Sequence, residues 1–300
     1  MLSRMRAPRL IVIGLLVASS GRAQEAQRPP ITGIAYVRIY AKDPAASRRF
    51  YAQELLLPEA KCPVRDCARY RVGKDQYVEV VHATASQTDG MQVIAFRTSD
   101  AEALRRYLAA HNVTVPPSVE KQPDGGAEFA VSDAEGHHIA FSEPKANPDQ
   151  QGAISHRLIH VGFVVRDRAA MDPFYKAILG FRPYWHGGMT PERTDWVSLQ
   201  VPDGSDWLEY MLNVSPTPSH HLLGVMYHLS LGVANMDTAA AALERTGWKP
   251  HGEEHKQMGL DGKYQLNVFD PDEVRVEFMD FSPSQKPCCS DFTAPHPQPQ

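Results

Sequence analysis

Apolar residues form four runs of strand length along the chain, near residues 32, 91, 157 and 226, and a helix signal follows each run. In the second run MQVIAF precedes Asp100 and the alanine-rich stretch AEALRRYLAAH, which is typical of a capped helix. Short apolar segments separated by turn signals come after each helix. The pattern predicts four units, each with one strand, one helix and about three further strands.

The starts of the other helices are also marked in the sequence. Asp43 and Pro44 form a cap with proline at the first helical position, and Asp237 begins another alanine-rich helix. Pro173 falls inside the third helix, so that helix is expected either to start at Asp172 or to kink at the proline.

The two halves of the chain are copies of each other. Phe174-Tyr175 aligns with Phe50-Tyr51, and His160 aligns with Tyr36. The polar segment EPKANPDQQGAISH, which contains proline and glycine, reads as the linker between them. The sequence therefore predicts one domain over residues 30–145, a second over 155–282 and a proline-rich, cysteine-containing tail over 283–300, where the prolines argue against packed structure.

The first 23 residues have the features of a secretory signal peptide. Arg4, Arg6 and Arg9 precede the apolar run LIVIGLLVASS, and small residues follow at Gly21 and Ala23. The run is too short to cross a bilayer as a helix, which needs about 20 residues. We expect a secreted or periplasmic protein that has no membrane anchor after cleavage.

Composition limits the partners of this protein. The 300 residues are 43% apolar and 22% charged, with a formal net charge of −4. No run of basic residues is present, so the electrostatic footprint of a nucleic-acid-binding protein is missing. We expect about two soluble globular domains and no nucleic acid.

Four cysteines remain in what is expected to be an oxidising compartment. Cys62 and Cys67 are close enough to close one loop as a disulfide. The adjacent Cys288 and Cys289 could bridge each other, bind a soft metal or pair between chains.

Two histidines and two glutamates recur at equivalent places in the second half. The period of two along a strand puts His160 and His228 on the faces opposite the apolar ones, and the closing strands WLEYML and VRVEFM present Glu209 and Glu277. His160 and Glu209 are 49 residues apart, as are His228 and Glu277. Two imidazoles and two carboxylates facing one cavity suit a divalent ion of nickel, zinc, cobalt, manganese or iron.

Four such units, with histidine on the first strand and glutamate on the last, resemble the vicinal oxygen chelate superfamily, which includes glyoxalase I, extradiol dioxygenases and bleomycin-resistance proteins. The motifs HVGFVV, FYKAILGF, WLEYML, YHLSLGV and FDPDEVRVEF carry the resemblance. It implies an α+β fold of two tandem vicinal-oxygen-chelate domains, each made of two paired βαβββ modules that form an open barrel-like sheet.

The first half departs from the metal pattern. Its counterparts of the four candidate ligands are Tyr36, Glu79, Val93 and Ala140, which include one carboxylate and no imidazole. We therefore expect residues 30–145 to be a degenerate copy without metal, serving as a wall of the pocket or as a homodimer contact.

The resemblance implies three chemistries. The quartet resembles that of glyoxalase I, which implies lyase or isomerase-type proton transfer on a chelated substrate, with Glu209 and Glu277 as catalytic carboxylates. Alternatively, His160, His228 and Glu277 fit the iron triad of extradiol ring-cleaving dioxygenases, although those enzymes generally have histidine where Glu209 stands. A third possibility is a resistance-type protein that binds a small molecule without turnover.

The substrate itself is not identified by the sequence beyond a small oxygenated molecule. Aromatic and basic residues expected at the mouth of the cavity are Trp185, His186, Trp207, Tyr264 and Arg275.

Overall fold

The computed structural model describes residues 27–83, 91–123, 125–144, 153–252 and 254–299. The predicted signal peptide and most of the predicted linker lie outside the described residues. Within them, no helix is long and apolar enough to cross a membrane.

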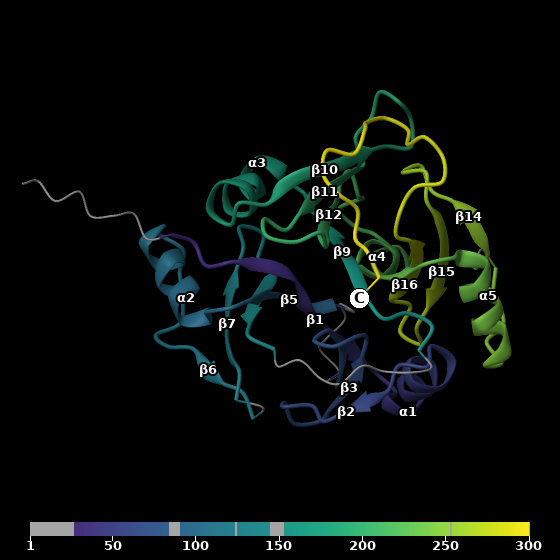
Figure 1. Ribbon diagram of the computed structural model, residues 1–300, viewed down its shortest axis with the longest axis horizontal. Coiled ribbons are helices and arrows are strands. Elements are labelled where there is room, and N and C mark those ends of the chain that lie inside the picture. Colours follow the sequence, from purple (N-terminus) through teal and green to yellow (C-terminus); the bar gives the residue numbers. More distant parts are fainter. Residues whose placement is uncertain (1–26, 84–90, 124, 145–152, 253, 300) are drawn as a thin grey trace, which may run out of the picture.

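Each half forms one eight-stranded sheet (Figure 1). In the first half the strands lie in the order β2-β3-β4-β1-β5-β8-β7-β6, and in the second in the order β10-β11-β12-β9-β13-β16-β15-β14. The strands of the first sheet are β1 (Ile31–Ala41), β2 (Glu59–Ala60), β3 (Cys67–Arg71), β4 (Tyr77–His82), β5 (Met91–Thr98), β6 (Glu120–Lys121), β7 (Ala127–Ser132) and β8 (His138–Ser142). Those of the second are β9 (Leu158–Val164), β10 (Arg182–Gly187), β11 (Trp196–Gln200), β12 (Trp207–Met211), β13 (His228–Val233), β14 (Lys256–Met258), β15 (Tyr264–Phe269) and β16 (Arg275–Asp280).

The predicted unit of strand, helix and three strands occurs four times. In every unit the first strand is parallel to the last, as in β1–β4 and β13–β16, and the first strands of two units pair antiparallel in the middle of each sheet. The helices between first and second strands are α1 (Pro44–Arg48) with η1 (Arg49–Glu54), α2 (Ala101–Ala110), α3 (Arg168–Asp172) with η2 (Pro173–Ile178) and α5 (Met236–Arg245). The α+β prediction of two tandem domains of paired modules is confirmed.

The helix starts predicted at Asp43 and Asp100 are confirmed, and the third helix starts at Arg168 and not at Asp172. The Asp43 and Asp100 side chains accept hydrogen bonds from the first backbone N–H groups of α1 and α2. For α5 the prediction of Asp237 was wrong, because Asn235 caps the helix and Asp237 lies in its first turn. Pro173 begins the π-helical segment η2, so the helix continues through the proline with a wider hydrogen-bonding pattern. The sequence analysis missed a short helix, α4 (His220–Met226).

Reciprocal hydrogen bonds join the two halves. The Tyr51 hydroxyl donates to Asp270 of the second half at 2.9 Å, and the aligned Tyr175 donates to Asp133 of the first half, also at 2.9 Å. All four groups lie in buried surroundings. The sequence duplication is thus also a duplication of contacts, because each half donates a tyrosine hydrogen bond to an aspartate of the other half.

The tail does not behave as its prolines predicted, because it packs along β10, the edge strand of the second sheet. The Thr293 N–H donates to the Tyr184 carbonyl at 3.0 Å, and Ser290 exchanges hydrogen bonds with the backbone of His186. In Figure 1 the yellow C-terminal segment arches over this strand. The prediction was wrong because an open sheet edge supplies hydrogen-bonding groups that no sequence periodicity reveals.

Candidate metal centre

Four adjacent central strands of the second sheet position the candidate ligands. In the β9–β13–β16 register, His160 and Glu277 both lie opposite Ser230, so they occupy one row across the sheet. In the neighbouring row, His228 and Glu209 both lie opposite Gly162. Alternation along each strand turns all four side chains to the same face, as the sequence pattern predicted.

Gly162 makes room for the histidine beside it. A methyl group built on Gly162 would overlap the imidazole of His228. The small residue two positions after His160 is therefore required for His228 to reach the centre of the sheet.

Three of the four candidates converge on one point. The Nε2 atoms of His160 and His228 are 3.0 Å apart, and His160 Nε2 is 3.3 Å from the Glu277 carboxylate oxygen Oε2. One ligand atom from each of these three residues lies within 4.8 Å of the other two, and all three residues are buried. Two atoms each about 2.1 Å from one ion are about 3.0 Å apart at a right angle, so the spacing fits a shared first-row ion.

The electrostatics also favour metal ligation. Burial lowers the pKa of His160 well below its usual value and lowers the pKa of His228 to about 3, so both imidazoles are neutral. His228 Nδ1 lies 3.2 Å from the Met226 carbonyl, which leaves its Nε2 lone pair directed at the cluster. Glu277 Oε2 is buried without a hydrogen-bond partner among the described residues, as expected of an atom meant for a cation.

Glu209 lies outside this group of three. Its Oε2 is 3.5 Å from His228 Nε2, and its Oε1 accepts a hydrogen bond from Ser198 Oγ at 3.1 Å. Burial raises the pKa of Glu209, while Arg275 lowers it. A half-buried carboxylate beside the cluster, with one hydroxyl donor, is suited to accept and return a proton.

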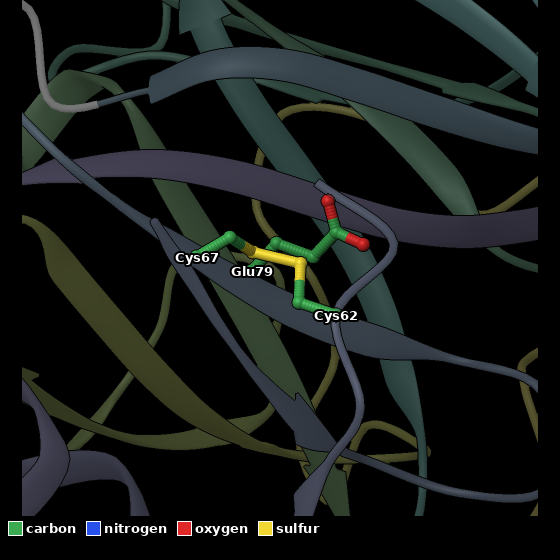
Figure 2. A group of neighbouring side chains, drawn as sticks. All are labelled: Cys62, Cys67 and Glu79. Atoms are coloured by element: carbon green, nitrogen blue, oxygen red, sulfur yellow. A yellow bond between two sulfur atoms is a disulfide. The ribbon is translucent and has the colours of Figure 1, made fainter. Parts of the chain in front are cut away.

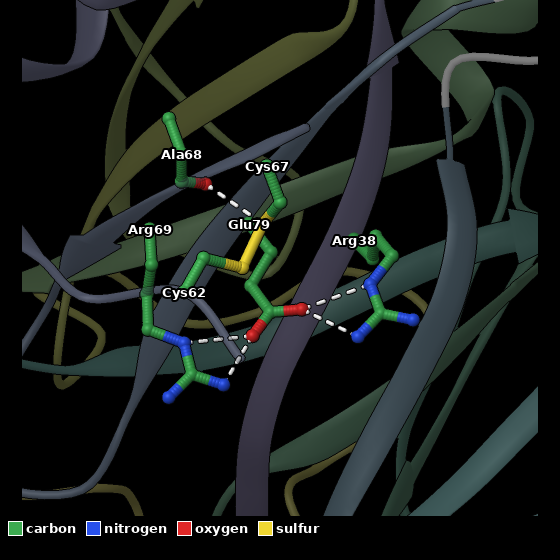
Figure 3. The surroundings of a disulfide bond; sticks show 6 residues. All are labelled: Arg38, Cys62, Cys67, Ala68, Arg69 and Glu79. Carbon is green, nitrogen blue, oxygen red and sulfur yellow. Dashed lines mark hydrogen bonds and ion pairs between the residues drawn. A yellow bond between two sulfur atoms is a disulfide. The ribbon is translucent and has the colours of Figure 1, made fainter. Parts of the chain in front are cut away.

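The corresponding place in the first half holds an ion-pair cluster. Glu79 lies close to Cys62 and Cys67 (Figure 2), but both sulfur atoms belong to the predicted disulfide, which is confirmed. The Glu79 carboxylate binds Arg38 through Nε at 2.8 Å and also pairs with Arg69 (Figure 3). Neither the sulfurs nor this doubly paired carboxylate are available to a metal ion.

A cavity of about 290 Å³ adjoins the three-residue cluster. Among the predicted substrate-binding residues, Trp185, Trp207 and Arg275 line it, and Trp207 stacks on the His160 ring at a centroid distance of 4.5 Å. The other two predicted residues, His186 and Tyr264, do not line this cavity. Tyr264 alternates with Lys263 and Gln265, which face the cavity, and His186 is an exposed residue next to Trp185.

Several residues of the cavity were missed by the sequence analysis. Lys263 is fully buried there, and burial lowers its pKa against the opposing effect of Asp261. Phe292 of the tail closes part of the wall. The tail disulfide joins Cys288 to Cys289, the first of the three possibilities for this pair, and the Trp185 indole N–H donates to the Cys288 carbonyl at 3.3 Å. Gln265 also lines the cavity, and Lys263 lies two positions before it, on the same face by strand alternation. That pattern could have pointed to Lys263, whereas nothing in the sequence pattern pointed to Phe292.

The sequence matches the model of the Glyoxalase/Bleomycin resistance protein/Dioxygenase superfamily over residues 33–141 and 157–278. With most of both halves matched, the chain belongs to this superfamily, as the resemblance implied. No curated protein matches the sequence.

Solved structures of similar fold include homoprotocatechuate 2,3-dioxygenase from Brevibacterium fuscum in its anaerobic complex with 3,4-dihydroxyphenylacetate. The TM-score is 0.62 at 18% identity, over 89% of this chain and 84% of that one. A room-temperature structure of an extradiol ring-cleaving dioxygenase from B. fuscum gives 0.63 at 19% identity, over 89% and 75%. At such identity the likeness shows a shared fold.

Proposed function

We propose that the second half is an iron(II)-dependent dioxygenase that chelates two adjacent hydroxyl groups of a small aromatic substrate and opens its ring. The observation that carries the proposal is the convergence of His160, His228 and Glu277, with Glu209 outside the group. Two histidines and one carboxylate, with further positions open, form the ligand set of non-haem iron oxygenases. The fold shared with extradiol dioxygenases supports it.

Each cavity residue has a separate task in this proposal. His160, His228 and Glu277 would hold the ion, which supplies a Lewis acid for the substrate oxygens and electrons for dioxygen. Trp207, stacked on His160, would present a flat apolar surface to the substrate ring. Glu209 would take the proton of a substrate hydroxyl and return it to the product.

Oxygen uptake tests the proposal. The protein is loaded anaerobically with iron(II), mixed with catechol or 3,4-dihydroxybenzoate, and exposed to ¹⁸O₂. The expected result is stoichiometric oxygen consumption, with both oxygen atoms in a ring-opened product. Absence of oxygen uptake with all of the vicinal diols tested would contradict the proposal. The active control is His186→Ala, which changes an exposed residue outside the cavity.

A second function is favoured by one observation, the half-buried carboxylate of Glu209 next to the cluster. Glyoxalase I-type lyase or isomerase chemistry moves a proton between neighbouring carbons through such a group. Nickel, zinc, cobalt or manganese would support that reaction, and solvent deuterium would enter the product without oxygen uptake.

We also propose that the protein is exported. The support is the signal-like segment 1–23 together with two disulfides, which persist mainly in oxidising compartments. N-terminal sequencing of the protein from its native host tests this, with residue 24 expected as the first residue and an intact Met1 contradicting it.

A further inference from the structure

Lys263 carries a buried ammonium group that, among the described residues, has no oxygen or nitrogen acceptor within 3.5 Å. Its side chain is fully buried and lines the metal cavity. Within the described part of the chain, Nζ makes a long contact of 3.9 Å to the Met279 sulfur, and the nearest carboxylate, that of Asp261, lies 3.7 Å away. Among the described residues, no other carboxylate comes within 4 Å of Nζ. An ammonium has three donors, and leaving them unmet in a buried site is costly.

Aromatic rings surround the group and offer its donors no strong acceptor. Nζ lies 4.4 Å from the ring centroid of Trp207, 5.1 Å from that of Phe292 and 5.5 Å from that of Tyr184. These rings hold a cation by its charge, but they accept no strong hydrogen bond. Phe292 belongs to the packed tail, so the chain's own C-terminus completes the enclosure around Nζ.

The charge of the cavity points the same way. The cavity is lined by three acidic residues, Glu209, Asp261 and Glu277, and by two basic residues, Lys263 and Arg275. A divalent ion at the cluster would turn this excess of one negative charge into an excess of one positive charge. An anionic ligand then binds more favourably than a neutral ligand of the same shape.

We propose that Lys263 binds an anionic group of the substrate, so that the natural substrate is an aromatic acid with a carboxylate in addition to its two adjacent oxygens. This inference rests on the proposed function for the adjacent oxygens, and on Lys263 and its surroundings for the anion. In this arrangement the cluster selects the diol end and Lys263 selects the acidic end.

Binding of two matched probes tests the inference without turnover. The affinities of 3,4-dihydroxybenzoate and its neutral analogue 3,4-dihydroxybenzamide are measured by calorimetry under anaerobic conditions, with both metal-free and iron(II)-loaded full-length protein. We expect the benzoate to bind at least about tenfold tighter to the iron(II)-loaded protein, and by a smaller factor to the metal-free protein, whose cavity keeps an excess of one negative charge. Lys263→Met should reduce the ratio to within about twofold, because it keeps the shape and removes the charge. Lys263→Gln replaces it if Lys263→Met fails to fold.

Asp261→Asn is the matched control. This variant removes the opposing charge. It keeps a side-chain oxygen for the hydrogen bond that Asp261 Oδ1 accepts from the Lys263 backbone N–H at 3.1 Å. The preference for benzoate should persist or increase. A wild-type ratio near one, a ratio unchanged in Lys263→Met, or no binding of either probe overturns the inference.

These results separate the inference from the proposed function. A benzoate preference that depends on Lys263, in a protein that consumes no oxygen, leaves the anion site standing and rejects the dioxygenase. Oxygen consumption with a ratio near one rejects the anion site alone.

Discussion

Glu79 and Glu209 occupy the same register position in the two halves, but they face different partners across the sheet. Glu79 on β4 lies opposite Arg38 of β1, whereas Glu209 on β12 lies opposite Gly162 of β9. In the first half the Arg38 guanidinium occupies this position, whereas in the second half Gly162 leaves room there for the His228 imidazole. This difference explains how one duplicated framework holds an ion-pair cluster in one half and the candidate metal centre in the other.

Removing the charge of Glu79 should destabilise the protein. Glu79→Gln leaves the half-buried guanidinium groups of Arg38 and Arg69 without their shared, fully buried carboxylate, at a cost of about 3–5 kcal/mol in the free energy of unfolding. Urea denaturation monitored by circular dichroism measures the change. The control is Glu59→Gln, which breaks an exposed pair with Arg48 and should cost less than about 1 kcal/mol. Equal losses in the two variants would show that the buried cluster contributes no special stability.

A methyl group at Gly162 should abolish metal binding. Gly162→Ala forces the His228 imidazole out of its place, so one of the three converging atoms is lost. The metal content of the anaerobically loaded protein should fall at least about tenfold. Ser230→Ala is the matched control on the neighbouring strand, because the buried Ser230 hydroxyl has no hydrogen-bond partner in the described part of the chain. Retention of metal by Gly162→Ala would rule out the ligand role of His228.

Glu209 is predicted to act on protons and not to hold the ion. Glu209→Gln should retain at least half of the bound metal, because Glu209 lies outside the three-residue group. Turnover should fall by about 10²–10⁴-fold, the usual contribution of a general acid or base. Ser198→Ala, which removes a neutral donor to the same carboxylate, should reduce turnover far less. A fully active Glu209→Gln enzyme would remove the proton-transfer role in either proposed chemistry.

The contact between the halves should depend on pH. Burial raises the pKa of Asp270 to about 7, because its desolvation outweighs the hydrogen bonds from Tyr51 and the backbone. The folded state therefore binds a proton that the unfolded state releases near pH 4. The resulting stability is fully present below about pH 4 and is lost as the pH rises through 7, with a change on the order of 4 kcal/mol.

Asp270→Asn should remove this component, because the amide carries no charge at any of these pH values. Thermal melts between pH 4 and pH 8 would show a flatter profile for the variant than for the wild type. Parallel profiles would mean that Asp270 does not titrate in this range.

The sequence was most informative where a side chain's neighbours follow from strand alternation. The faces of His160, His228 and Glu277 follow from a period of two, and the equal spacings follow from the duplication. The same alternation puts Lys263 and Gln265, and not the aromatic Tyr264 between them, in the cavity. Phe292 could not be predicted from any local pattern, because its position depends on an edge strand about a hundred residues earlier in the chain.

The separation of Glu209 from the other three residues also required coordinates. The doubled spacing of 49 residues treats Glu209 and Glu277 alike. In space, Glu277 shares a row with His160, and Glu209 shares a row with His228 and turns toward Ser198. The distinction changes the favoured chemistry from a four-ligand glyoxalase-type site to a triad with a neighbouring base.

The most direct test of the central claim is the number of iron ions bound per chain after anaerobic loading with iron(II) and removal of the excess, measured by mass spectrometry of the metal. The account predicts one ion per chain in the wild type, one in the His186→Ala control, and fewer than about 0.1 in His228→Ala and Glu277→Ala. A wild-type protein without iron, or a His228→Ala protein that still holds one ion, would contradict it.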